Sequence, residues 1–224
     1  MRCAPHDPAE SRRLSAALRD VVSRTGRGPL VVVCIGTDRS TGDALGPLTG
    51  CELLARGYPP ELVFGTLDEP VHAGNLGEAL VRVGSAYPGA VVLAVDACLG
   101  SPENVGSISL ADGPVRPGAG VNKSLPPVGQ LSLTGVVNVA GFMEYFVLQN
   151  TRLSLVVRMA GVIAQAIVEA VPHQSDVWNS WAVRAAQGAG SRVPAKAVAC
   201  GEVALTCSGS GEVPGETIQT DSER

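Results

Sequence analysis

Apolar residues recur at helical spacing near the start of the chain. They are Leu14, Leu18, Val21 and Val22. A period of three to four residues is typical of a helix with one buried face. Asp7 can cap the first turn, Pro8 suits the first helical position and Gly26 can end the helix. The pattern therefore predicts an amphipathic helix over about residues 8–25.

A continuous apolar run, PLVVVCIG at residues 29–36, follows this helix. A strand with one solvated face would alternate apolar and polar residues, so this run predicts a strand covered on both faces. Further segments predict a helix within 43–57, a strand at 61–70, a helix at 75–89 and a strand at 90–100. Strands that alternate with helices are typical of parallel crossovers, so we expect an α/β fold with a mostly parallel sheet.

The second half of the chain is less regular. Residues 105–118 have an alternation compatible with a strand, whereas residues 117–138 are rich in Gly and Pro and indicate a long structured loop with one short strand at most. Loops of that length inside domains are often functional. A helix, a break near QNT and a long apolar helix from about residue 153 to 171 are expected next. A short helix can begin after residue 172.

The apolar segment FMEYFVLQ, residues 142–149, permits two interpretations. It can fill the core or form a face between two copies of the chain, so a homo-oligomer remains one of the alternatives. We favour the core, because an α/β sheet needs apolar helices on both faces.

Composition and charge narrow the class of protein. The chain has 224 residues, of which 45% are hydrophobic and 17% charged, and its formal net charge is -4. We expect a single α/β domain over residues 1–186 and a flexible C-terminal tail over residues 187–224, where periodicity is lost. The negative charge gives no general attraction to nucleic acid or to an anionic membrane, so neither is an expected partner.

The cysteines and the N-terminus indicate the compartment. Six cysteines are scattered along the chain without a Cys-x-x-Cys pair, and the first residues show no apolar signal region. Cys34 and Cys98 fall in or after apolar runs, where a thiol usually acts as a small hydrophobe. We therefore expect reduced thiols and a cytoplasmic location.

Carboxylates and one imidazole follow the ends of the predicted strands. Because ligands bind beyond the carboxyl ends of parallel strands, these groups are candidates for a common site. They are Asp38 and Asp43 after the first strand, Asp68, Glu69 and His72 after the second, and Asp96 in the third. Each has a structural alternative, because aspartate also caps helices and closes turns.

Three stretches carry a resemblance to a known family. CIGTDRSTGDALGPLTG, GTLDEPVHAGNL and GAGVNKSLPPVGQLSLTGVVNVAGFMEYFVLQNTRL are together similar to the YyaC family of sporulation proteins, which is related to the germination protease of spore-forming bacteria. The similarity covers about residues 10–172. It implies a three-layer phosphorylase/hydrolase-like fold, shared more distantly with hydrogenase maturation endopeptidases, and activity on small acid-soluble spore proteins.

The resemblance also implies site residues. Asp43, in Asp-Ala-Leu-Gly-Pro, and Asp96, in Asp-Ala, match the proposed catalytic aspartates of the germination protease, and the sequence does not decide which is acid and which is base. Apart from the resemblance, position after a strand end or in the Gly/Pro-rich loop makes five residues candidates for substrate binding: Asp38, Asp68, Glu69, His72 and Lys123. Hydrogenase maturation enzymes use a further histidine to hold nickel, but no histidine lies between Asp96 and His173. We expect no metal and no cofactor, unless His72 reaches the site.

Three functions follow from these observations. The first is a spore-associated peptidase that hydrolyses small acid-soluble spore proteins with an aspartate pair, in the cytoplasm of the sporulating cell or in the spore interior. The second is a noncatalytic sporulation protein that uses the same fold to bind another sporulation protein. The third is a metal-dependent processing endopeptidase, whose ligand set is incomplete here.

Overall fold

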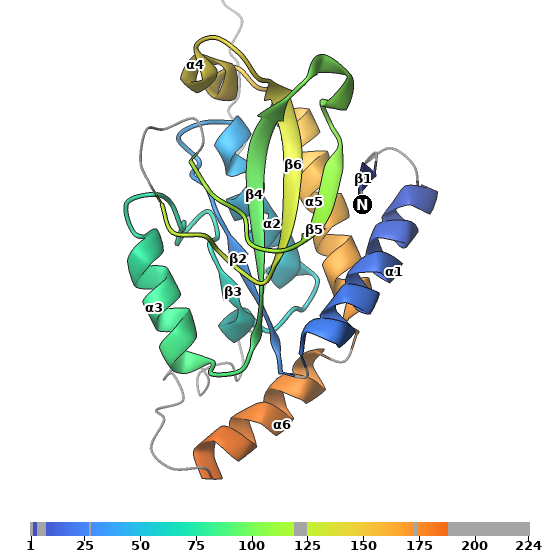
Figure 1. Ribbon diagram of the computed structural model, residues 1–224, viewed down its shortest axis with the longest axis vertical. Helices are drawn as coiled ribbons and strands as arrows, with labels where there is room; N and C mark the ends of the chain where they lie inside the picture. Colours follow the sequence, from blue (N-terminus) through green and yellow to red (C-terminus); the bar gives the residue numbers. More distant parts are fainter. Residues whose placement is uncertain (1, 4–7, 27, 119–124, 173, 188–224) are drawn as a thin grey trace, which may run out of the picture. The chain divides into compact units, whose positions relative to one another are not determined.

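A computed structural model describes residues 2–3, 8–26, 28–118, 125–172 and 174–187 (Figure 1). All of them belong to one unit that spans Met1–Pro194, whereas a second unit, Ala195–Arg224, lies outside the described residues. The predicted tail, residues 187–224, also lies outside them except for its first residue. The domain boundary at 186 therefore stays a prediction.

Six strands form one sheet, in the order β1-β5-β6-β4-β2-β3. Their bounds are β1 Arg2–Cys3, β2 Leu30–Cys34, β3 Val63–Phe64, β4 Val91–Gly100, β5 Ile108–Asp112 and β6 Leu131–Val139. β2 pairs in parallel with β3 and β4, and β4 pairs in parallel with β6. β5 is antiparallel to both β6 and β1. The predicted α/β fold with a mostly parallel sheet is confirmed.

Helices cover both faces of this sheet. They are α1 Pro8–Thr25, α2 Leu45–Ala55, α3 Leu76–Ala86, α4 Glu144–Gln149, α5 Leu153–Ala170 and α6 Gln174–Gln187. Short 3₁₀ turns lie at η1 Gly42–Ala44, η2 Pro60–Leu62 and η3 Pro102–Asn104. These bounds confirm the predicted helix near residues 8–25 and the break between α4 and α5.

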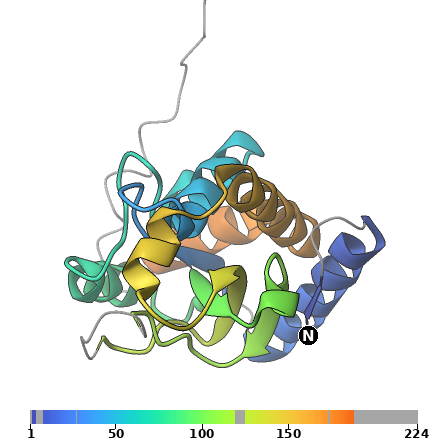
Figure 2. The ribbon, with the colours of Figure 1, turned by 90° about the horizontal axis from the view of Figure 1, so that it is seen from above.

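The order of the strands decides which helix lies on which face. The chain leaves β2 in one direction to reach β3, then returns past β2 to reach β4. Since such crossovers are right-handed, α2 and α3 must lie on opposite faces. α2 and α5 lie behind the strands in Figure 1, whereas α3 lies toward the viewer beside β3. The view from above shows α1 and α5 side by side (Figure 2), and the two helices are in contact.

α5 is the central helix of its layer. Its length of 18 residues and its mean hydropathy of 1.7 would suffice to cross a membrane by length and composition alone. However, Val156, Met159 and Ile163 are fully buried, and the helix packs against α1 and α2. This burial is typical of a core helix.

One predicted loop is in fact a central strand. Residues 131–139 form β6, which pairs with both β4 and β5, so the expectation of a short strand at most within 117–138 is wrong. Gly135 weakens the strand pattern, but it is required by packing. A Cβ at this position would lie 2.5 Å from the Leu45 side chain and 2.7 Å from that of Met159. β3, by contrast, has only two residues of the strand predicted at 61–70.

Two glycines bring the end of β2 against the start of α2. The backbone of Gly36 has a φ of +147°, and a Cβ there would lie 1.9 Å from the carbonyl oxygen of Asp43. A Cβ on Gly46 would lie 2.1 Å from the carbonyl oxygen of Ile35. The Thr37 N–H donates to the Asp43 carbonyl at 3.1 Å and closes the loop. Side chains larger than hydrogen are therefore excluded where the chain turns from strand to helix.

We predict that Gly36→Ala destabilises the fold more than Gly113→Ala. Gly113 has the same φ of +147°, but a Cβ on Gly113 would meet nothing within 4 Å. The control variant therefore measures only the free-energy cost of placing alanine at this backbone conformation. The additional clash at Gly36 should lower the free energy of unfolding by about 2 kcal/mol or more beyond that control. Denaturant unfolding of both variants measures the difference. Equal losses would show that the loop can move away from β2.

Candidate functional site

Asp43 and Asp96 lie where two strand connections diverge. Asp43 is in η1, which follows β2, and Asp96 is in β4. The pairing between these strands ends at Cys34 and Val95, and the Ile35 N–H still donates to the Val95 carbonyl at 2.7 Å. Asp96 is thus the next residue of β4 after β2 leaves the sheet. In open α/β sheets, ligands bind in the crevice at such a switch point.

The two carboxyl groups influence each other. The pKa of Asp96 is raised from 3.8 to about 8. Burial is the largest cause, the Ala97 N–H lowers the pKa, and the negative charge of Asp43 contributes to the rise. That N–H donates to Asp96 Oδ1 at 3.0 Å. Two nearby carboxyl groups cannot both ionise cheaply, so they titrate as a pair. The structure thus brings the two predicted catalytic residues together.

Asp43 has a milder environment. Burial raises its pKa above 3.8, while the neighbouring Ser40 hydroxyl lowers it. Burial therefore acts on both carboxyl groups, but only Asp96 has a pKa raised as far as about 8. The roles of acid and base stay a prediction.

Ser40 is a site residue that the sequence analysis missed. Its side chain is 5% exposed, and its hydroxyl has no hydrogen-bond partner in the described part of the chain. It lies beside the Asp43 carboxyl without reaching the geometry of a full hydrogen bond. The signal in the sequence was the Ser-x-x-Asp spacing from Ser40 to Asp43, which is also the spacing of an ordinary helix start.

Asp38 does not join the pair in the described contacts. It is exposed on the loop between β2 and η1, and the Thr37 hydroxyl donates to its Oδ1 at a long 3.5 Å. This placement suits a solvated loop residue. Its predicted part in substrate binding stays a prediction.

The acids after β3 lie on an exposed turn. Asp68 and Glu69 are both exposed, and the turn is closed by the Thr66 N–H, which donates to the Glu69 carbonyl at 3.1 Å. The Glu69 N–H donates in return to the Thr66 hydroxyl at 3.1 Å. Their predicted contact with substrate also stays a prediction.

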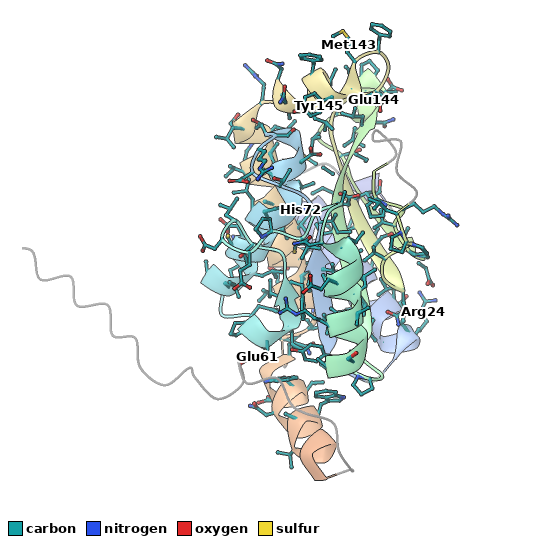
Figure 3. All side chains as sticks on the ribbon, turned by 90° about the vertical axis from the view of Figure 1, so that its left-hand side faces the viewer. Arg24, Glu61, His72, Met143, Glu144 and Tyr145 are labelled. Atoms are coloured by element: carbon teal, nitrogen blue, oxygen red, sulfur yellow. The ribbon has the colours of Figure 1, made fainter. Side chains whose placement is uncertain are left out.

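His72 organises the start of α3. Its ring Nδ1 accepts a hydrogen bond from the Gly74 N–H at 3.1 Å, and its own N–H donates to Asn75 Oδ1 at 2.8 Å. Figure 3 shows His72 well below the labelled residues of α4. Among the described contacts, none joins the imidazole to Asp43 or Asp96. A structural role accounts for every hydrogen bond named here.

Two further expectations concern Lys123 and metal ions. Lys123 lies outside the described residues, so its place relative to the pair stays open. Within the described ranges, no group of three or more His, Cys, Asp and Glu side chains could hold a metal ion. The expected absence of a metal stays a prediction.

α4 braces the turn that carries Asp43. A Cβ on Gly42 of η1 would lie 2.7 Å from the Leu148 side chain and 3.1 Å from the Thr151 hydroxyl. Asn138 Nδ2, at the end of β6, donates to the Val147 carbonyl at 3.1 Å and to the Thr151 hydroxyl at 3.2 Å. These contacts fix the six-residue helix against η1.

The outer side of the same segment is apolar and exposed. Its largest exposed residues are Phe142, Met143, Tyr145 and Phe146, with 89%, 53%, 61% and 53% of their surface accessible. Met143 and Tyr145 are labelled in Figure 3. The prediction that FMEYFVLQ fills the core is therefore wrong, because only the side toward η1 is covered. We call these four residues the α4 apolar surface; groups of this kind often bind another protein.

Comparison with known families shows to which family the chain belongs. Residues 3–166 match the family described as "Protein of unknown function (DUF1256)". The chain belongs to the DUF1256 family. The protein is also 50% identical over 161 residues to the uncharacterized protein YyaC of Bacillus subtilis (strain 168), which covers 72% of this chain and 78% of that protein. The expected membership of the YyaC family is confirmed.

A solved structure resembles this DUF1256 protein more distantly. It is the NiFe hydrogenase maturation protease HycI from Thermococcus kodakarensis KOD1, with 21% sequence identity and a TM-score of 0.48. The match covers 70% of this chain and 99% of that one.

We predict that Asp96→Asn flattens the pH dependence of stability in this DUF1256 protein. Asp96 ionises near 3.8 when unfolded and near 8 when folded. Between these values the folded state binds the additional proton, so the free energy of unfolding falls as the pH rises from about 4 to 8. Each unit of pKa difference corresponds to about 1.4 kcal/mol, so several kcal/mol should be involved.

Denaturant unfolding across this pH range measures the effect, with the exposed Asp68→Asn as the control. The control should follow the unmodified protein. If the free energy of unfolding of Asp96→Asn changed with pH in parallel with that of the unmodified protein, the raised pKa of Asp96 would be contradicted.

Proposed function

We propose that the protein is a peptide-bond hydrolase in which Asp43 and Asp96 act as general base and general acid. The observation that carries the proposal is the asymmetric carboxyl pair at the switch point, with Asp96 raised to a pKa of about 8 by burial and by the charge of Asp43. Peptide hydrolysis by two carboxyl groups requires one of each protonation state at the same pH.

The proposed chemistry assigns one role to each residue. Ionised Asp43 takes a proton from a water molecule as its oxygen attacks the peptide carbonyl carbon. Protonated Asp96 donates its proton to the leaving nitrogen as the C–N bond breaks. One proton returned from Asp43 to Asp96 restores the starting state. Burial assists this proton donation because it keeps Asp96 protonated at neutral pH.

Small acid-soluble spore proteins are the proposed substrates. This choice rests on the resemblance to the germination protease, whose catalytic aspartates match Asp43 and Asp96. Under this proposal the protein acts in the cytoplasm of the sporulating cell or in the spore interior.

A binding function without catalysis is the second candidate. The α4 apolar surface supports it, because this surface lies on a helix that contacts the η1 turn. In that case a sporulation protein would bind at the same edge without being cut.

We predict that the purified full-length protein cleaves small acid-soluble spore proteins, and that Asp43→Asn and Asp96→Asn each lower the rate roughly 100-fold or more. Each variant removes a proton acceptor or a proton donor without changing the size of the side chain. Electrophoresis and mass spectrometry of the products give the rates and the cut sites.

Asp112→Asn is the matched control, because it removes an exposed carboxylate that has no predicted part in the site. It should remain within a few-fold of the unmodified protein. Equal cleavage by all variants would contradict the aspartate pair. Binding of the spore proteins without any cleavage would favour the second candidate.

We predict a bell-shaped dependence of kcat/KM on pH. The rate should rise as Asp43 ionises, at a pH above the ordinary 3.8, and fall as Asp96 loses its proton near pH 8. Initial rates measured from about pH 4 to 10 test both limbs, with the exposed Asp112→Asn expected to give the same profile. A rate that keeps rising above pH 9 would rule out Asp96 as the acid.

A further inference from the structure

The α4 apolar surface is held in a fixed shape although its residues are exposed. Asn138 ties the helix to the end of β6 through the Val147 carbonyl and the Thr151 hydroxyl. The N–H groups of Phe146 and Val147 donate to the Met143 carbonyl at 2.9 and 3.2 Å, and so hold the first turn. A surface that is already ordered loses little conformational freedom when a partner binds to it.

The side chains of this surface are large, and two of them are paired. The rings of Tyr145 and Phe146 meet edge to face, with centroids 5.9 Å apart and an angle of 83° between the planes. Phe142 is 89% exposed, so it contributes almost nothing to the core of its own chain. Removing such groups from water is favourable, and a partner that covers them would therefore be stabilised.

The size of the surface matches one half of a homodimer interface. A large aromatic residue has an accessible surface of about 200 Å², so the four residues together expose roughly 500 Å² per chain. Homodimer interfaces are about 65% apolar, so an apolar area of this size corresponds to about 800 Å² per copy once the polar rim is included. An area of about 800 Å² per partner is the standard size of a stable interface.

The composition of the segment favours a second copy over other occupants. Interfaces with transient partners are no more apolar than the rest of a protein surface, whereas homodimer interfaces are more apolar. Glu144 is the single charged residue between positions 140 and 151, so the segment has no Lys or Arg to attract an anionic membrane. The chain after residue 187 contains no aromatic residue that could cover the surface from within the same copy.

We propose that the α4 apolar surface is the interface of a symmetric homodimer. In a two-fold contact the same surface serves both copies, so α4 of one copy packs against α4 of the other. The inner side of α4 meets η1 through Leu148 and Gly42, so the second copy lies behind the turn that carries Asp43. This inference goes beyond the hydrolase function and does not rest on it.

The experiment compares two α4 variants, Phe142→Ser and Tyr145→Ser, with Val81→Ser in the full-length protein. Phe142 and Tyr145 are 89% and 61% exposed, so the fold should tolerate both changes. Val81 is 68% exposed in α3, and its variant removes an apolar side chain from another part of the surface. Sedimentation velocity from about 1 to 100 µM gives the dissociation constant of the dimer. Hydrogen exchange of the unmodified protein at both concentrations locates the interface.

We expect the unmodified protein to be dimeric at the upper concentrations, with α4 amides that exchange more slowly there than in the dilute sample. Phe142→Ser and Tyr145→Ser should each raise the dissociation constant about 30-fold or more, because each removes a large aromatic anchor. Val81→Ser should leave it within a few-fold of the unmodified value.

Three results would overturn the homodimer. The first is a monomer over the whole concentration range, including a monomer that binds another protein or lipid vesicles through α4. The second is a dimer whose dissociation constant neither α4 variant changes, because its interface would then lie elsewhere. The third is an equal loss in Val81→Ser, which would indicate nonspecific association of apolar side chains.

Discussion

The candidate site depends on a backbone contact between β2 and the turn that follows it. At Gly36 and Gly46 the chain approaches itself so closely that a Cβ would lie about 2 Å from a carbonyl oxygen in each case, 1.9 and 2.1 Å. This contact turns the chain directly from strand to helix. It also fixes η1, so that the Asp43 side chain is presented to β4. A looser turn would leave Asp43 in solvent, as Asp38 is.

Burial then gives the two carboxyl groups different properties. Asp96 is held within the sheet and Asp43 on its edge, so desolvation raises the pKa of Asp96 more clearly. Asp43 adds to this difference through its charge. Neither aspartate would have a raised pKa if it stood alone in water. The fold therefore gives two copies of one residue type different surroundings and different pKa shifts.

The sequence predicted the parts of this arrangement that depend on chain order. Continuous apolar runs indicated the parallel strands. The rule for strand ends pointed to a group of residues that includes Asp43 and Asp96, and the resemblance to the germination protease selected these two. Parts that depend on packing were not predictable. Gly135 weakens the pattern of β6 because side chains of α2 and α5 occupy the space beside it. The four residues of the α4 apolar surface are exposed, although their apolar character favoured a place in the core. Ser40 was missed because its spacing to Asp43 also suits an ordinary helix cap.

The aromatic contacts of α6 have a consequence for spectroscopy. Both tryptophans of the chain, Trp178 and Trp181, lie in α6 with ring centroids 5.4 Å apart, and each lies 5.7 Å from the ring of Tyr87. Tyr87 precedes the first residue of β4, whereas Asp96 lies toward the other end of that strand. Intrinsic fluorescence will thus report how α6 is seated on the domain. Occupancy of the crevice at Asp43 and Asp96 will need a probe of its own.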